Sequence, residues 1–365
     1  MVGPAPTMHS GGRTFEEGAT MRWRPGLTVY WRAPGESQVG IEGAHILTGL
    51  SPGEQELLDL LAAGATEPLE VVAARRGWTG RQVAALVTRL PSWALIEDGA
   101  PVVASPPAAA WSRWEAAGVE RPRDRAGVCL QVDGLDALGL RIACLLAEGG
   151  IGRLVLADEE PVRPSDVRPG GYRGSEVGGP RAPAALALLR RLFPHLPLAS
   201  ADAAGTPCGD EGAADLVVMI DHGVSDPLRY RRYLHTDLPH LAVVVRELDV
   251  CVGPLVRPGH GPCLRCIELT RTDADDRWPV LATQLRGSGS PVPLESASAA
   301  LAAALAAHQA LAFADARPVA LAATSYLVDA IHPVPRFRTW PVHPACGCAP
   351  ESLDSGAQRA GHRGG

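Results

Sequence analysis

Four cysteines in two close pairs are the residues of this 365-residue chain whose types and spacing best suit chemistry. Cys263 and Cys266 form a CxxC pair after a Gly-Pro turn, and Cys346 and Cys348 form a CxC pair near the C-terminus. Four thiolates from two tight pairs suit a tetrahedral structural zinc ion. We therefore expect zinc to tie the C-terminal part of the chain back onto its domain.

Two alternatives to a four-cysteine zinc site stay open from the sequence. A CxC pair is less usual as a second half than CxxC, so His343 is kept as a substitute ligand. A redox disulfide within the CxxC pair is the other interpretation, although no thioredoxin-like pattern surrounds it.

A glycine turn is the second candidate site. Gly134 and Gly139 hold the outer positions of a G-x-G-x-x-G motif, and Asp136 stands where the middle glycine belongs. A strand, this turn and a helix bind nucleotide phosphates on the helix N-terminus. A carboxylate at the middle position adds bulk and like charge, so Asp136 predicts weakened phosphate binding. Asp158 and Asp221 end two later apolar runs, and turn capping is the plain alternative role for both.

The elements that must position these groups alternate between strand and helix patterns, which predicts an α/β fold with an open, Rossmann-like, mostly parallel sheet. The polar segment 271–293 is expected to be a mobile loop, and it contains no cysteine for a thioester or persulfide relay. The expected strands are 128–132, 154–156, 214–220, 241–245, 250–256, 326–331 and 336–340, and the expected helices are 138–146, 182–193, 227–234 and 295–313.

Residues 21–100 read as a separate small α+β domain of the winged-helix type. Short strands precede helices that start near Ser51, Thr66 and Thr79, and a closing strand follows at 95–99. The pattern resembles the PqqD-like element that binds leader peptides of ribosomally made natural products. DNA binding is the rival function, but residues 45–100 carry four arginines against seven carboxylates. A peptide would instead add a strand near 27–31 or 38–42.

Composition bounds the rest of the chain. The net charge of −6 argues against a nucleic-acid binder, and all basic residues are arginine, so no mechanism here uses a lysine. No apolar run reaches the length of a membrane span, and the N-terminus lacks a signal core, which predicts a cytoplasmic protein with reduced thiols. We expect disorder at 1–20 and 351–365, a linker at 101–125, and a second domain at 126–350.

The second domain resembles the ThiF/MoeB adenylyltransferases, relatives of ubiquitin-activating enzymes. The resemblance rests on the glycine turn, the paired cysteines and several further stretches. These are GGIGRLVLAD at 149–158, Val162 with Ser165-Asp166, Gly178 with Pro180-Arg181, and ADLVVMID at 214–221. It implies a fold that binds ATP and Mg²⁺ and adenylates the C-terminal carboxylate of a small carrier protein or peptide, commonly as a homodimer.

Carried over residue by residue, the resemblance places Asp158 on the ribose hydroxyls and Asp221 on the metal. Arg181 stands where the family has its catalytic lysine. Asp166 and Pro169 stand at positions where the family has asparagine and arginine, and Arg168 or Arg173 is the nearest replacement cation. Arginine and lysine are not interchangeable at a tight phosphate site.

Two hypotheses follow from these substitutions. The first is a recognition and scaffold subunit with a degenerate nucleotide site, which holds a precursor peptide for a partner maturation enzyme such as an ATP-using cyclodehydratase. A resemblance to the ThiF-like subunits of azoline-forming systems motivates it. The second is an active adenylyltransferase with a rearranged arginine set.

Overall fold

The computed structural model describes residues 21–24, 27–41, 45–63, 67–91, 94–97, 125–201, 213–287 and 294–348. The chain divides into two compact units, residues 1–121 and 122–365. The expected disordered ends at 1–20 and 351–365 lie outside the described residues, as does the expected linker apart from Arg125.

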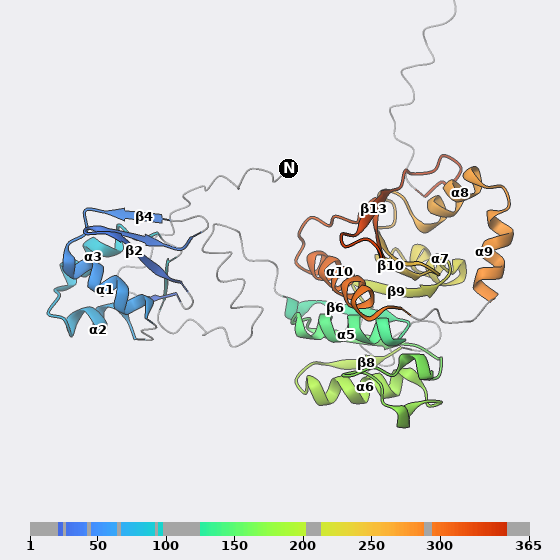
Figure 1. Cartoon of the computed structure of the whole chain (residues 1–365), viewed down its shortest axis with the longest axis horizontal. Coiled ribbons are helices and arrows are strands. Elements are labelled where there is room, and N and C mark those ends of the chain that lie inside the picture. Colours follow the sequence, from blue (N-terminus) through green and yellow to red (C-terminus); the bar gives the residue numbers. More distant parts are fainter. Residues whose placement is uncertain are drawn as a thin grey trace, which may run out of the picture. The chain divides into compact units, whose positions relative to one another are not determined.

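The first unit contains two small antiparallel sheets and several helices (Figure 1). Strand β1 (Met21–Trp23) pairs with β5 (Leu95–Glu97), and β2 (Val29–Ala33), β3 (Glu36–Val39) and β4 (His45–Thr48) form a separate sheet in that order. Helices α1 (Pro52–Ala62), α2 (Leu69–Ala74) and α3 (Gly80–Val87) lie between β4 and β5 in the chain. Their leucines bury a common core with β1, β3 and β4.

Two of the expected helix starts are as the sequence indicates. Ser51 with Glu54 and Thr79 with Gln82 both form capping boxes. The helix expected to start at Thr66 begins instead at Leu69, behind Pro68. Proline fixes its own φ and disfavours helical geometry in the preceding residue, so the chain enters this helix later than the threonine suggested.

The second unit is built on an eight-stranded sheet of order β13-β12-β11-β10-β9-β6-β7-β8. The strands β8 (Leu198–Ser200), β7 (Arg153–Ala157), β6 (Cys129–Asp133), β9 (Leu216–His222) and β10 (His240–Val245) run parallel. Antiparallel strands β11 (Asp249–Val256), β12 (Thr324–Asp329) and β13 (Arg336–Thr339) extend one edge. The parallel part has the Rossmann-like strand order, with its switch point between β6 and β9.

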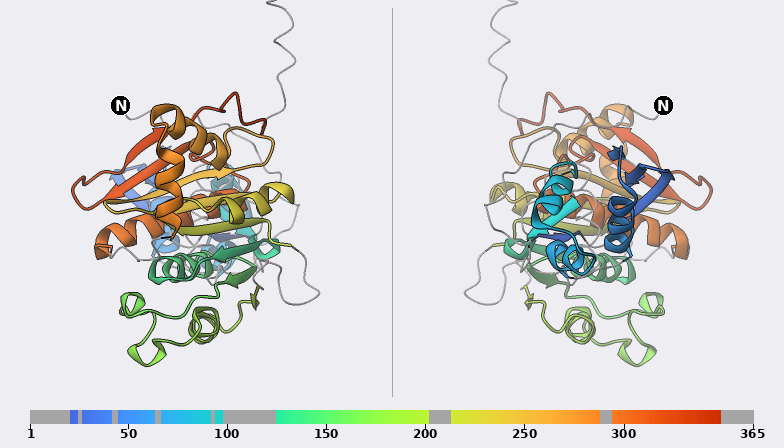
Figure 2. Two further views of the ribbon diagram at one scale, coloured as in Figure 1. Left: turned by 90° about the vertical axis from the view of Figure 1, so that its right-hand side faces the viewer. Right: turned by 90° about the vertical axis from the view of Figure 1, so that its left-hand side faces the viewer.

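Helices cover both faces of this sheet, and β13 and α6 lie toward its opposite ends (Figures 1 and 2). Helices α5 (Ala137–Glu148), α6 (Arg181–Leu192) and α10 (Ser296–Ala314) share a core with Leu216, Val218 and Ile220 of β9. Helices α7 (Pro227–His235) and α8 (Leu264–Ala274) share the other core with Val217 and Met219. Alternation along β9 therefore separates a turn side of the sheet, which faces α5, from a cysteine side, which faces α8.

The expected mobile loop at 271–293 is wrong over residues 271–287. Helix α8 runs to Ala274, and α9 spans Trp278–Gly287. The Trp278 indole N–H donates to Glu268 Oε2 at 2.7 Å, and the Arg271 guanidinium lies 4.8 Å from the Trp278 ring centroid. These contacts anchor the start of α9 on α8.

The expectation that no apolar run is long enough to span a membrane is also wrong. Among the described residues, α10 reaches this length, with 19 residues and a mean hydropathy of 1.5. Half of this apolar stretch is buried, and α10 packs against α5 and β11. Burial in the domain core therefore accounts for its apolar composition, and a cytoplasmic location stays a prediction.

Candidate functional site

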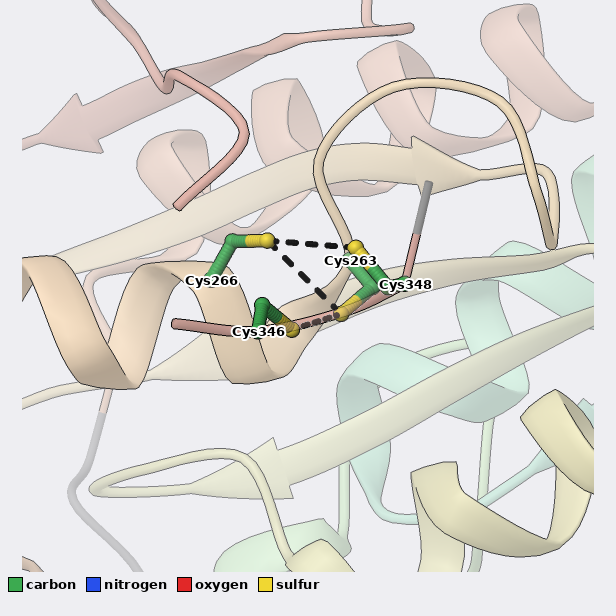
Figure 3. Close-up of side chains that lie close together, drawn as sticks. All are labelled: Cys263, Cys266, Cys346 and Cys348. Carbon is green, nitrogen blue, oxygen red and sulfur yellow. Dashed lines mark hydrogen bonds between the residues drawn. The ribbon is translucent and has the colours of Figure 1, made fainter. Parts of the chain in front are cut away.

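The four cysteines of the sequence prediction converge in the structure (Figure 3). Cys263 precedes α8, Cys266 lies in its first turn, and Cys346 and Cys348 come from the loop after β13. The Sγ atoms all lie within 4.8 Å of one another. Three of the Sγ pairs are 3.9 Å (263–266), 3.4 Å (263–346) and 3.3 Å (266–348) apart.

This arrangement, hereafter the cysteine cluster, can hold a metal ion. A tetrahedron of sulfurs at about 2.3 Å from zinc has S···S edges of roughly 3.8 Å. The sulfurs are too far apart for a disulfide bond of about 2.0 Å, and all four cysteines are free. The geometry thus does not favour the redox interpretation.

His343 is not a fourth ligand in this structure. Its Nε2 atom lies 2.8 Å from Asp273 Oδ2, and its Nδ1 atom accepts the Ala345 N–H at 3.1 Å. Its carbonyl accepts the Cys346 N–H at 3.0 Å. The residue therefore fixes the loop that carries Cys346 rather than joining the four sulfurs.

The two outer glycines of the turn are required by close packing. Gly134 has φ +105°, and a Cβ there would lie 2.9 Å from the Ile220 carbonyl oxygen of β9. A Cβ at Gly139 would lie 2.0 Å from the Gly134 carbonyl oxygen. Strand β6, the turn and α5 can approach β9 this closely only with glycine at both positions.

Asp136 is the N-cap of α5 and is buried. Its Oδ1 atom accepts the N–H groups of Leu138 at 3.0 Å and Gly139 at 2.9 Å. Its Oδ2 atom lies 3.0 Å from His222 Nε2. Burial alone would raise the pKa of Asp136, but the His222 contact and the Gly139 N–H outweigh it and lower that pKa. The carboxylate occupies the helix N-terminus at which such turns bind phosphate.

Asp158 and Arg181 are tied together beneath the turn. Asp158 accepts the N–H groups of Leu135 at 2.6 Å and Glu160 at 2.7 Å. The buried Arg181 guanidinium lies 3.3 Å from Asp158 Oδ2 and 2.8 Å from Asp166 Oδ2. Burial would lower the pKa of Arg181, but the two carboxylates outweigh it and raise that pKa. The charge of Arg181 is therefore neutralised inside the protein.

Asp221 points to the cysteine side of the sheet, away from Asp136. It follows Ile220, which faces the turn side, and it pairs with Arg229 of α7. Its Oδ2 atom accepts the Asp226 N–H at 3.2 Å. Burial raises the pKa of Asp221 to about 6 despite the opposing effect of Arg229. The structure thus does not bring Asp221 together with the other predicted site residues, and His222 takes the place beside Asp136.

A cavity of about 180 Å³ opens at the carboxyl ends of the parallel strands, on the turn side. It is lined by Asp136 and the first turns of α5, residues 165–166 and 168–171, His222, the end of β10 and the start of α10. Two of its cations, Arg141 and Arg168, have no carboxylate partner among the residues described in the structure. Within the described ranges, the Arg168 guanidinium donates only to the Val167 carbonyl, at 2.9 Å.

Sequence reasoning missed two arginines of this region. Arg229 binds both Asp133, at 2.9 Å, and Asp221, and no motif marks it. Arg141 could have been found, because Ala137, Arg141 and Cys144 recur at helical spacing and all line the cavity.

The comparisons with known proteins agree with this architecture. A model of the ThiF family matches residues 109–348. No curated protein sequence matches the chain significantly.

Solved structures share the fold at low sequence identity. The E. coli MccB–succinimide structure has a TM-score of 0.60 and 13% identity, over 90% of this chain and 99% of that chain. The E. coli MccB–ATP structure has a TM-score of 0.59 and 12% identity, over 90% and 99%. PaaA has a TM-score of 0.60 and 14% identity, over 87% and 99%. Ninety per cent is more of the chain than the second unit contains, so the likeness extends into the first unit.

Proposed function

Because the chain belongs to the ThiF family, we propose that it is a peptide-binding member of that family whose nucleotide site no longer adenylates. It would act as recognition and scaffold subunit in the maturation of a ribosomally made peptide, and hold the precursor for a partner maturation enzyme. A homodimer and the identity of that enzyme stay predictions.

The occupied helix N-terminus carries this proposal. The Asp136 carboxylate accepts the Leu138 and Gly139 N–H groups that a phosphate would need, and His222 fixes it there. A phosphate would have to displace a buried carboxylate and meet its negative charge. Arg181, at the position of the family's lysine, is held by Asp158 and Asp166 and is not a free cation.

Peptide binding is supported by the first unit and by the neighbours. MccB, a microcin C7 biosynthetic enzyme, has been solved in complex with N-formylated MccA. In the first unit, β2 pairs only with β3 among the described strands, and its residue Trp31 is 62% exposed. An unpaired edge beside an exposed tryptophan suits strand addition by an extended peptide.

Fluorescence polarisation on the full chain tests peptide binding. The probe is the labelled leader peptide encoded in the same operon, and saturable binding is expected. Trp31→Ala should weaken it about tenfold, a loss typical of one aromatic anchor. Val71→Ala, an exposed apolar site on α2, is the matched control and should leave binding unchanged. Absence of saturable binding would contradict the proposal.

Calorimetry with Mg-ATP tests the nucleotide site. The wild-type chain should show no binding, whereas Asp136→Gly frees the helix N-terminus and restores the glycine of the motif, so binding should appear. Asp136→Ala removes the charge but keeps a Cβ, and it separates the two effects. Tight binding by the wild-type chain would contradict a degenerate site.

An active adenylyltransferase is the second candidate function. It is favoured by Arg141 and Arg168, two cavity cations without carboxylate partners among the described residues. It predicts ATP–pyrophosphate exchange with a carrier or peptide C-terminus, abolished when the two cavity cations are removed together by Arg141→Gln and Arg168→Gln. No exchange with any carrier tested would remove it.

We also propose that the cysteine cluster holds a structural zinc ion. The four sulfurs match the donor set and the spacing of a closed tetrahedral site, and no position is left for a substrate.

A further inference from the structure

The cavity at the start of α5 has a charge distribution that a degenerate nucleotide site does not explain. Two carboxylates line it, Asp136 and Asp166. Asp136 is satisfied by His222 and by the N-terminus of α5, and Asp166 is paired with Arg181. The charges left over are those of Arg141 and Arg168, which no carboxylate in the described part of the chain pairs with. The cavity is therefore built to receive one compact negative group.

The size of the cavity and its remaining walls further restrict which ligands can fit. A cavity of about 180 Å³ is smaller than the roughly 300–1,000 Å³ of pockets that enclose drug-sized ligands. Beside the two arginines, its walls are the apolar side chains of Leu138, Leu140, Val245 and Leu294. A single anionic head on a short aliphatic stem fits this volume and this mixture of walls.

A carboxylate suits this cavity better than a polyphosphate does. Guanidinium groups bind the two oxygens of a carboxylate through parallel N–H bonds. A polyphosphate would also need the Leu138 and Gly139 N–H groups, which Asp136 already occupies.

We propose that this cavity is a carboxylate-binding site in which Arg141 and Arg168 hold a carboxylate on a small aliphatic stem. The inference rests on the proposed function, because it requires the phosphate position to be closed by Asp136. The same chemistry has three sources: a free small acid, the C-terminal residue of a peptide, or an acidic side chain within one.

The test is calorimetric titration of the full chain with N-acetyl-L-leucine, with N-acetyl-L-leucine amide as the uncharged match. The acid should bind and the amide should not. Arg141→Gln and Arg168→Gln should each weaken binding of the acid tenfold or more. Arg190→Gln, an exposed arginine on α6 outside the cavity, should leave it unchanged. Unchanged zinc content and circular dichroism show that the variants fold.

Three peptides then separate the sources. One ends in a free leucine carboxylate, the second is its C-terminal amide, and the third is the amide with an internal glutamate. Competition with N-acetyl-L-leucine by the first peptide alone assigns a C-terminus, competition by the third alone assigns an acidic side chain, and competition by neither assigns a free acid.

The outcomes also separate this inference from the proposed function. The carboxylate site is contradicted if the acid and the amide bind equally well. It is also contradicted if the acid binds the wild type and both arginine variants with equal affinity. If neither the acid nor ATP binds, the carboxylate site is overturned while leader-peptide binding is untouched. If ATP binds and displaces the acid, the degenerate nucleotide site is overturned as well.

Discussion

The cysteine cluster and the glycine turn lie in the same domain but treat their polar groups in opposite ways. In the cluster, four sulfurs lie within 4.8 Å of one another, and three of their pairs are 3.3–3.9 Å apart, so the ligand atoms converge on a point that a metal can fill. In the turn, the N–H groups of Leu138 and Gly139 already have an acceptor in Asp136. A motif thus marks where a chain can bind a ligand. Whether the site is open depends on whether its donor groups are already hydrogen-bonded within the protein.

The largest expected effect comes from opening the cysteine cluster. Cys263→Ser should reduce zinc from one ion per chain to none, as measured by elemental analysis. Loss of a structural zinc ion removes on the order of 5 kcal/mol or more of folding free energy, because the loop carrying Cys346 and Cys348 loses its anchor. Cys144→Ser, a cavity cysteine outside the cluster, should keep full zinc content. Full zinc binding by Cys263→Ser would contradict a four-cysteine site.

Removing the cation beneath the turn should have the next largest effect. Arg181→Ala leaves Asp158 and Asp166 buried without their partner, which costs about 3–5 kcal/mol. Arg181→Lys keeps one charge but cannot serve both carboxylates, so it should lose less. Urea denaturation measures both variants. A phosphate-binding arginine would instead change ATP binding with little loss of stability. An unchanged denaturation midpoint in Arg181→Ala would therefore contradict a structural role for this cation.

The stability of the folded chain should depend on pH through the buried side chain of His240, which has no charged partner in the part of the chain that the structure describes. His240 begins β10 on the cysteine side, its ring is buried, and its Nε2 atom has no hydrogen-bond partner among the described residues. Burial lowers the pKa of His240 to about 4. The unfolded chain therefore binds a proton below pH 6.5 that the folded chain refuses, and stability falls as the pH falls from 6.5 toward 4.

The loss of folding stability that His240 causes is about 2 kcal/mol at pH 5. Asp221, whose pKa burial raises to about 6, acts with the opposite sign, since its ionisation above that pH weakens the folded state. The variant His240→Leu isolates the histidine, and thermal unfolding at pH 7 and pH 5 should show a smaller drop than in wild type. The exposed His235→Leu is the control and should keep the wild-type drop. An equal drop in both variants would show that His240 does not titrate in this window.

The sequence predicted the parts of this molecule that depend on local patterns. Local patterns predicted the strands on either side of α5, the glycine turn and the four-cysteine cluster. Periodicity, turn chemistry and ligand spacing are each read over a few residues. The side of the sheet could not be read in the same way for Asp221. The resemblance marked its position in the chain, but alternation along β9 and the distant Arg229 place its side chain opposite the cavity.

One further error and one missed role have the same origin. The segment 271–287 looked like a loop because it is polar, but contacts of Trp278 with Glu268 and Arg271 make it helical. Asp136 was expected to repel a phosphate, and its capping role emerged only from the geometry of α5. In each case the outcome depends on a partner that composition does not identify.

The smallest effect concerns the capping carboxylate, and it tests the comparison most directly. Asp136→Ala removes an N-cap and should lower stability by about 1–2 kcal/mol at pH 7. Because the folded pKa of Asp136 is lowered, its stabilisation is present above the unfolded pKa of about 3.8 and is lost as the pH falls through the folded pKa. The stability difference between wild type and Asp136→Ala should therefore shrink below pH 4. Asp136→Asn keeps a capping oxygen and should lose less at pH 7, with little further change in acid. If Asp136→Ala proved neutral at pH 7, the turn would be open like the cysteine cluster rather than closed by its own side chain.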